Sequence, residues 1–290
     1  MKIAVIIPTY GRPEVAARLL AHLEGQSRRP DEVIVSAAAA DHLPPPRLHR
    51  FPVARLVGPA GLAAQRNRAI EHAGRRFDVL AFFDDDFLPE DGYLARIEEL
   101  FAEHEDWVVV MGRLVRDGAA GEGLDFDSGL LALRAAEANR PPPELSFDDN
   151  GAYGCNMSIR ASAIGQLRFD ERLVLYGWQE DVDFTSQLRP RGRLVRPGEP
   201  LGVHLGLKSG KVSGVRFGYS QIVNPFYLVR KGTISPRFAL RLAGRNLAAN
   251  LLRSVRPEPY VDRRGRLRGN LLALAHVVSG RLEPEYVLNI

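Results

Sequence analysis

Residues 79–86 read Val79-Leu80-Ala81-Phe82-Phe83-Asp84-Asp85-Asp86, an apolar run that ends in three consecutive carboxylates. The apolar residues predict a buried strand, and the two-residue period of a strand turns Asp84 and Asp86 to one side and Asp85 to the other. Two carboxylates at a strand end suit a hard divalent cation such as Mg²⁺, which prefers oxygen ligands. A solvated acidic turn is the alternative interpretation of this triplet.

The segments around this run alternate strand-like and helical patterns, which predicts an α/β fold with a mostly parallel central sheet flanked by helices. We expect strands at Ile3–Pro8, Glu32–Ser36, Ala54–Val57, Val79–Phe83 and Trp107–Val115, and helices from Pro13, at Leu62–Ala73 and from Pro89. Residues 117–150 contain several glycines and prolines without a clear period, so we expect a long loop with short elements there.

The composition of the 290 residues, with 45% hydrophobic and 26% charged, is typical of a soluble globular protein, and the length suits one catalytic domain with an appendage. Cys155 is the only cysteine, so neither an internal disulfide nor a cysteine-based zinc site can form. We therefore expect a reducing, cytoplasmic compartment. No apolar stretch approaches the ~20 residues of a membrane-spanning helix.

The charge of the chain is divided unevenly. Residues 1–188 hold 20 Lys and Arg against 30 Asp and Glu, a net charge of −10, whereas residues 189–290 hold 19 against 5, a net charge of +14. A basic segment of this kind could meet nucleic acid, anionic lipid or a phosphorylated substrate. Because the sequence contains no dedicated nucleic-acid-binding motif, we do not expect nucleic acid as a partner.

The basic segment carries the last predicted helices. The helix expected from Pro236 onward has an apolar stripe and a basic stripe. The apolar stripe consists of Leu240, Ala243, Leu247 and Leu251, and the basic stripe of Arg237, Arg241 and Arg245. A second helix is expected at Leu271–Leu282. Such helices could rest on an anionic membrane surface, which would place the protein at the inner face of the cell membrane. They could instead pack on the catalytic domain and leave the arginines in water.

Five segments that follow one another in the chain carry characteristic motifs. They are Val5–Arg12, Gly61–Asn67, Phe82–Asp86 with Pro89 and Leu94 after it, Gly154–Arg160 and Gly177–Phe184. Together they resemble the motifs of the inverting glycosyltransferases of family 2, which adopt the GT-A fold of nucleotide-diphospho-sugar transferases. The likeness extends over about residues 1–230, with Gln65 in place of the alanine that is usual in the second segment.

This resemblance implies a catalytic domain over residues 1–235 and a basic amphipathic helical extension at 236–290. Within the domain, it implies a nucleotide-binding half at about 1–116 and an acceptor-side half at about 117–235. It also implies transfer of a sugar from a nucleotide-sugar donor to a hydroxyl of a saccharide or lipid-linked glycan, as in polysaccharide biosynthesis at the cell envelope. Because members of the family commonly extend lipid-linked glycans, we favour the membrane hypothesis for the last helices.

The resemblance also gives individual side chains a role. Asp86 and Asp84, with His204, are expected to bind Mn²⁺ or Mg²⁺, and the cation stabilises the growing charge of the diphosphate leaving group. Asp181 is the expected general base that takes the proton of the acceptor hydroxyl, and Glu180 is the second candidate. A structural role for His204 and an acidic helix start at residues 180–183 are the alternatives.

Further residues are expected to contact the substrates, because ligands of open α/β sheets gather beyond the carboxyl ends of the strands. The expected donor contacts are Thr9, Tyr10, Arg12, Arg66, Asn67, Asp84 and Asp85. The expected sugar, acceptor or diphosphate contacts are Asn156, Arg160, Trp178, Lys208 and Lys211. The alternatives are structural: a surface turn at Thr9–Arg12, a surface ion pair for Arg66, an exposed Asp85, hydrogen bonding for Asn156 and Arg160, core packing for Trp178, and a solvated loop around Lys208.

A second position, at the end of the second strand, also departs from the family. The second strand ends in Ser36, where members often carry an acidic residue that holds the nucleobase, and Asp41 could substitute only if its loop folds back. The resemblance therefore implies no particular base. A nucleotidylyltransferase could share the fold, but a Gly-rich, lysine-containing phosphate loop does not follow the first strand. A catalytically silent binding or assembly subunit is the other alternative, and the intact acidic triplet weighs against it.

Overall fold

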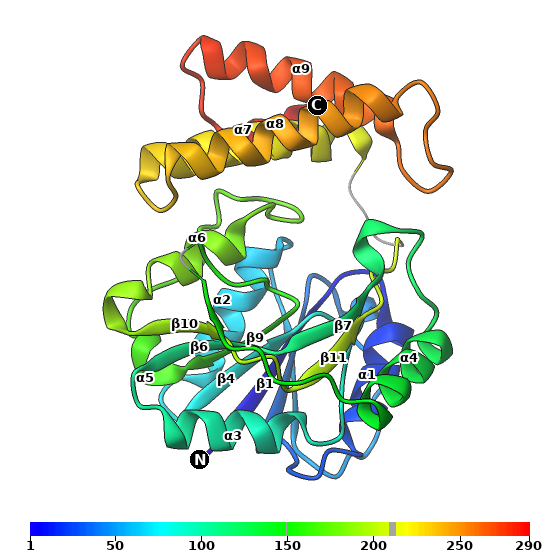
Figure 1. The fold of residues 1–290 in the computed structure, drawn as a ribbon, viewed down its shortest axis with the longest axis vertical. Coiled ribbons are helices and arrows are strands. Elements are labelled where there is room, and N and C mark those ends of the chain that lie inside the picture. The colour runs from blue at the N-terminus through cyan, green and yellow to red at the C-terminus, as the bar shows by residue number, and fades with distance from the viewer. Residues whose placement is uncertain (149, 209–212) are drawn as a thin grey trace.

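The computed structural model describes residues 1–148, 150–208 and 213–290. An α/β body lies below a layer formed by α7 (Gly214–Lys231), α8 (Pro236–Arg253) and α9 (Arg263–Val278) in the view of Figure 1, and the N-terminus lies at the far end of the body from this layer. The predicted class, a mostly parallel central sheet flanked by helices and followed by C-terminal helices, is confirmed.

The central sheet of the described residues has eight strands in the order β3-β2-β1-β4-β9-β6-β10-β8. Neighbouring strands are parallel except that β9 is antiparallel to both β4 and β6, and β8 is antiparallel to β10. Their bounds are β1 Ile3–Thr9, β2 Glu32–Ala37, β3 Val53–Val57, β4 Val79–Phe83, β6 Trp107–Met111, β8 Ser146–Phe147, β9 Asn156–Arg160 and β10 Arg193–Arg196.

Helices cover both faces of this sheet, which is why its parallel strands are continuous apolar runs. All 7 residues of β1 are buried. Val5 and Ile7 pack in the same cluster as α1 (Pro13–Leu23) and α3 (Tyr93–Glu103), whereas Ala4 and Ile6 pack with α2 (Leu62–Ala73), α5 (Ala161–Ile164) and α6 (Glu180–Ser186). The strand period of two therefore distributes the side chains of β1 between two hydrophobic cores.

A second, smaller sheet places β11 (Leu201–His204) between β5 (Phe87–Pro89) and β7 (Arg113–Asp117). It corrects two predictions. The helix expected from Pro89 begins at Tyr93, because the preceding residues pair with β11. The single strand expected at Trp107–Val115 is divided at Gly112, where a Cβ atom would collide with the Tyr93 ring, so the chain passes from one sheet to the other.

The loop expected at residues 117–150 contains a helix, α4 (Phe126–Ala138), which packs on β11. The side chain of Asp125 caps this helix by accepting a hydrogen bond from the backbone N–H of Ser128 at 2.8 Å. The prediction of a mostly irregular segment was therefore wrong. Short 3-10 turns occur at Ala40–His42, Gly118–Ala120, Arg189–Arg191 and Pro284–Asn289.

The C-terminal helices pack closely on one another. Gly218 of α7 and Gly269 of α9 lie at their crossing, and a Cβ atom at either position would overlap the backbone of the other helix. α7 belongs to the same helical layer as α8 and α9, and the domain boundary at residue 236 stays a prediction. Among the described residues, no helix combines the length and hydrophobicity needed to cross a membrane.

The helical layer is attached to the body by a hydrophobic cluster that includes Leu173 and Val182 of the body and Leu228 and Ala239 of the layer. The apolar stripe predicted for α8 is only partly buried: Ala243 is buried, but Leu240 is 61% exposed. Packing on the catalytic body, which was one of the two alternatives, is therefore present, and it leaves other apolar side chains of the layer on the surface.

Candidate active site

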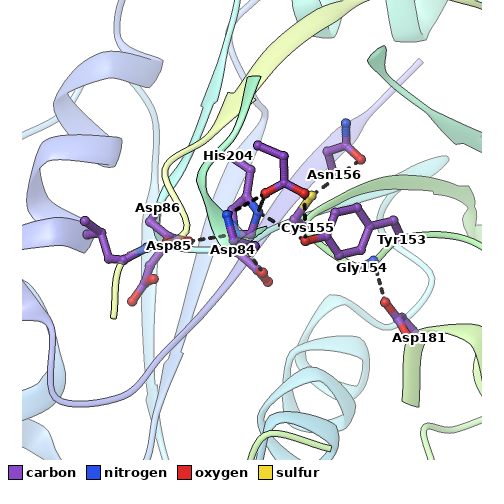
Figure 2. A network of polar contacts seen from close by, with 12 residues as sticks. Asp84, Asp85, Asp86, Tyr153, Gly154, Cys155, Asn156, Asp181 and His204 are labelled. Carbon is purple, nitrogen blue, oxygen red and sulfur yellow. Dashed lines mark hydrogen bonds and ion pairs between the residues drawn. The ribbon is translucent and has the colours of Figure 1, made fainter. Parts of the chain in front are cut away.

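Two carboxylates and an imidazole converge where β4 and β11 end. Asp84 and Asp86 follow β4, and His204 is the last residue of β11. Each of the three offers one ligand atom, and these atoms lie within 4.8 Å of one another. The imidazole Nε2 is 3.5 Å from Oδ1 of Asp86 and 4.0 Å from Oδ2 of Asp84 (Figure 2). This donor set, with two hard oxygens and one nitrogen, suits Mn²⁺ or Mg²⁺.

The other ring nitrogen of His204 is held by residues that sequence reasoning missed. Nδ1 lies 2.8 Å from Oδ1 of Asp117 and 3.2 Å from the hydroxyl of Tyr153. Burial alone lowers the pKa of His204, but the hydrogen bonds with Asp117 and Asp86 outweigh burial and raise the pKa to about 10. No sequence pattern marks Asp117, because the pairing of β7 with β11 in the small sheet brings it opposite His204.

The middle carboxylate, Asp85, lies in the turn between β4 and β5 and points away from this cluster. It is buried, so the alternative of an exposed Asp85 is wrong. Oδ2 of Asp85 accepts a hydrogen bond from the Thr9 hydroxyl at 2.7 Å, and the carboxylate pairs with Arg12. Burial raises the pKa of Asp85 to about 7 against the opposing charge of Arg12.

Arg12 therefore has carboxylate partners inside the protein. The donor contact expected for it stays a prediction. Nη1 of Arg12 also lies 3.4 Å from Oδ2 of Asp86. Burial raises the pKa of Asp86, but the hydrogen bond and attraction to His204, together with the charge of Arg12, leave it below the usual range. Asp86 is consequently ionised and able to act as a cation ligand at neutral pH.

Asp181, the expected base, lies on the first turn of α6. Its Oδ2 accepts a hydrogen bond from the N–H of Gly154 at 2.7 Å, and its Oδ1 accepts one from the N–H of Val182 at 2.8 Å (Figure 2). Burial raises the pKa of Asp181, although the charge of Arg66 opposes this rise. Gln179, the N-cap residue of α6, has a left-handed backbone with φ 72°, a strained conformation that is common at functional sites.

Arg66 connects the two groups of carboxylates from within the protein. Its side chain is 1% exposed, so the alternative of a surface ion pair is wrong. It pairs with Glu180 and with Asp84, the latter at 3.1 Å, and it donates to the carbonyl of Gly154 at 2.9 Å. Burial raises the pKa of Glu180, and the ion pair with Arg66 opposes this rise. Glu180, the second candidate base, is therefore engaged with Arg66.

Three predicted substrate residues make structural hydrogen bonds. Asn67 donates to the carbonyl of Phe169 at 2.9 Å, and Asn156 donates to the carbonyl of Gly112 at 2.8 Å. Arg160 lies at the opposite end of β9 from Asn156, since it pairs with Val79 at the start of β4. Its guanidinium donates to the carbonyls of Phe101, His104 and Trp107, so the structure places Arg160 away from the site.

The remaining predicted residues lie around the site. Tyr10 is 52% exposed and its ring contacts His42, and Lys208 donates to the carbonyl of Ala119 at 2.9 Å. Trp178 packs its ring against Phe217, and its indole N–H is buried without a hydrogen-bond partner among the described residues. Lys211 lies outside the residues that the structure describes.

The ends of β1 and β2 are tied together by Gln65, the residue that departs from the family pattern. Its amide donates to the carbonyls of Thr9 and Ser36, each at 2.7 Å. The hydroxyl of Ser36 accepts a hydrogen bond from Arg68 at 2.9 Å, whereas Asp41 is exposed in the turn after β2. An arginine therefore lies beside the position where an acidic residue was expected.

Comparison with known protein families gives one match. The family model described as glycosyl transferase family 2 matches residues 4–159, more than half of the chain. A search of curated proteins finds no match to this sequence.

Solved structures with the same fold span nearly the whole chain. A mannosyltransferase from Pyrobaculum calidifontis, PcManGT in complex with GDP-Man and Mn²⁺, is 17% identical with a TM-score of 0.56, over 99% of this chain and 85% of that chain. Residues 1–349 of S. aureus TarS in complex with UDP are 16% identical with a TM-score of 0.57, over 98% of this chain and 89% of that chain. This likeness confirms the predicted GT-A fold.

Proposed function

This chain belongs to glycosyl transferase family 2 and is a glycosyltransferase, and we propose that it transfers a sugar from a nucleotide-sugar donor with inversion, using a divalent cation and Asp181 as the general base. Similar structures support a nucleotide-sugar donor, since PcManGT is in complex with GDP-Man and TarS with UDP-GlcNAc. The family match therefore favours a glycosyltransferase over the two alternatives, a nucleotidylyltransferase and a catalytically silent subunit.

One observation carries the proposal: Gly154 and Arg66 connect the cation ligands to the base. The N–H of Gly154 donates to Asp181, and its carbonyl accepts from Arg66, which also pairs with Asp84. A cation-bound diphosphate and an acceptor hydroxyl near Asp181 would therefore occupy one continuous site. Inversion needs this arrangement, because the base must act on the side of the sugar opposite the leaving group.

Asp181 is prepared for proton transfer by its surroundings. Two backbone N–H groups fix the orientation of its carboxylate, and burial brings its pKa closer to neutral. Both effects favour removal of a proton from an acceptor hydroxyl at about 2.6–3.2 Å. Bound Mn²⁺ or Mg²⁺, held by Asp84, Asp86 and His204, would supply positive charge to the diphosphate leaving group.

The test combines donor binding with turnover. UDP, GDP and their sugar nucleotides, each with and without Mn²⁺, are screened by thermal shift, where a true ligand at one hundred times its Kd adds about 2.7 kcal/mol. Release of nucleoside diphosphate is then measured for the wild type and for Asp181→Asn. We expect the variant to bind donor normally and to lose about 10²–10⁴-fold in turnover. Equal turnover in the two proteins would rule out Asp181 as the base.

The acceptor is proposed to be a saccharide or lipid-linked glycan, with the helical layer close to an anionic membrane surface. Exposed apolar side chains of this layer, Leu251, Leu252 and Val255, support contact with lipid beside the exposed Arg256. The buried, lone Cys155 is consistent with the cytoplasm as the compartment. Flotation with liposomes tests the membrane contact: binding that does not depend on anionic lipid would contradict it.

A further inference from the structure

A cavity of about 330 Å³ opens beside Asp181, between the catalytic body and α8. On the body side its wall includes Tyr153, Gln179 and Asp181. The side-chain oxygen of Gln179 is buried and has no hydrogen-bond partner in the described part of the chain. A molecule in this cavity would therefore be within reach of the proposed base.

The opposite wall of the cavity comes from one face of α8. Its residues Phe238, Arg241, Leu242 and Arg245 line the cavity, and their spacing of three, four and seven residues puts them on the same side of a helix. Two of the three arginines of the predicted basic stripe, Arg241 and Arg245, therefore line this open cavity, and both remain exposed to solvent. Two like charges one turn apart repel, which an anionic ligand between them would relieve.

Some charged side chains of the cavity wall have a partner within the protein. Arg196 pairs with Asp148 at 2.9 Å, and Asp181 is held by backbone N–H groups. Within the residues that the structure describes, neither Arg241 nor Arg245 has an ion pair or a hydrogen bond. The described residues therefore give these two guanidinium groups of the cavity wall no ion-pair partner.

We propose that the acceptor carries an anionic group, a phosphate or a carboxylate, that Arg241 and Arg245 bind while its hydroxyl meets Asp181. This inference rests on the proposed function and names the class of acceptor. Guanidinium groups bind both anions in a bidentate geometry. The diphosphate of the donor is a poor candidate for this anion, because none of Asp84, Asp86 and His204 is among the residues that line the cavity.

The test measures binding in the absence of donor and metal, by calorimetry at constant ionic strength. Glucose 6-phosphate and glucuronate are the anionic probes, and glucose is the neutral counterpart. We expect the wild type to bind the anionic probes about tenfold or more tightly than glucose. Arg241→Gln and Arg245→Gln should each weaken anion binding about tenfold, and the double variant should lose the preference for anions.

The matched control is Arg237→Gln, an exposed arginine of α8 that does not line the cavity among the described residues. It removes the same charge from the same helix, and anion binding should stay unchanged. The proposal is overturned if the wild type shows no preference for the anionic probes, if the double variant keeps it, or if Arg237→Gln weakens it equally. Thermal unfolding of each variant verifies that the fold is intact.

Two further measurements complete the test. The first distinguishes a lipid-linked anion from an anion on the saccharide, and the second tests the proposed function independently of the anion preference. Co-sedimentation with phosphatidylglycerol vesicles that is lost in the double variant, but not in Arg237→Gln, assigns the anion to a lipid-linked acceptor. Loss confined to the soluble probes assigns it to the saccharide itself. Binding of a nucleoside diphosphate with Mn²⁺ is measured separately, so failure to bind donor would reject the proposed function without deciding the anion preference.

Discussion

The carboxylate of Asp117 lies 2.8 Å from Nδ1 of His204, and this contact turns Nε2 of the imidazole toward Asp84 and Asp86. A hydrogen bond of this kind fixes the tautomer and the orientation of a histidine ligand. Asp117 is contributed by β7 and His204 by β11, two neighbouring strands of the small sheet. The small sheet therefore shapes the proposed cation site, although it contributes a single ligand to it.

Removing this contact should weaken cation binding. We expect Asp117→Ala to lower the affinity for Mn²⁺ about 10–100-fold, because the imidazole loses its orientation and part of its basicity. Isothermal titration measures the affinity. Asp127→Asn, which changes an exposed carboxylate on α4, is the control and should bind Mn²⁺ like the wild type. An unchanged affinity in Asp117→Ala would show that the contact does not support the site.

The affinity for Mn²⁺ should rise with pH. Because the pKa of His204 is raised to about 10 in the metal-free protein, its imidazole is protonated at pH 6–8 and must release a proton to bind a cation. Each pH unit should therefore raise the affinity about tenfold over this range. His204→Gln should bind more weakly and lose most of this slope. A wild-type affinity that does not change with pH would contradict ligation by His204.

The buried ion pair of Arg66 and Glu180 should matter more for stability than a surface pair. Arg66→Met leaves Glu180 buried without its partner, so the free energy of unfolding should fall by about 3–5 kcal/mol. Adding Glu180→Gln should recover part of this loss. Arg76→Met, which breaks the half-exposed pair with Glu32, should cost at most about 1 kcal/mol. Chemical denaturation gives these values, and equal losses for the two arginines would refute the difference.

Two glycine substitutions should have opposite effects. Gly269→Ala forces a methyl group against the backbone of α7, and we expect it to destabilise the protein by about 1–3 kcal/mol. Gly244→Ala in α8 meets nothing within 4 Å, so it should stabilise by up to about 1 kcal/mol through its higher helix propensity. Thermal unfolding distinguishes the two, and a neutral Gly269→Ala would show that the crossing of α7 and α9 can relax.

Local patterns predicted the elements that depend on local chemistry. The bounds of α2 (Leu62–Ala73) and β4 (Val79–Phe83) agree with the structure, since an apolar period and flanking turn residues determine both. Asp84 and Asp86 lie on one side and Asp85 on the other as predicted, but the triplet forms the turn between β4 and β5, so this arrangement comes from the turn and not from the strand period. The structure brings His204 beside them, as expected from the family resemblance.

Long-range pairing determined the positions that could not be predicted. Asn156 and Arg160 belong to one motif but are the two ends of β9, and its antiparallel pairing with β4 puts Asn156 beside Phe83 and Arg160 beside Val79, at the far end of β4 from the acidic triplet. Similarly, the burial of Arg66 depends on Glu180, which is far away in the sequence. The face of α8 that meets the cavity depends on how the helical layer packs on the body, which the sequence pattern of α8 does not contain.

The placement of β9 has a consequence for any attempt to dissect this chain. Although β9 follows residue 116, it is inserted between β4 and β6, and β10 then pairs with the other side of β6. A truncated fragment that ended near residue 116 would leave β4 with one unpaired edge and β6 with two. Unpaired edges promote aggregation. The donor and acceptor halves should consequently unfold in a single cooperative transition, and neither should be obtainable as an autonomous fragment.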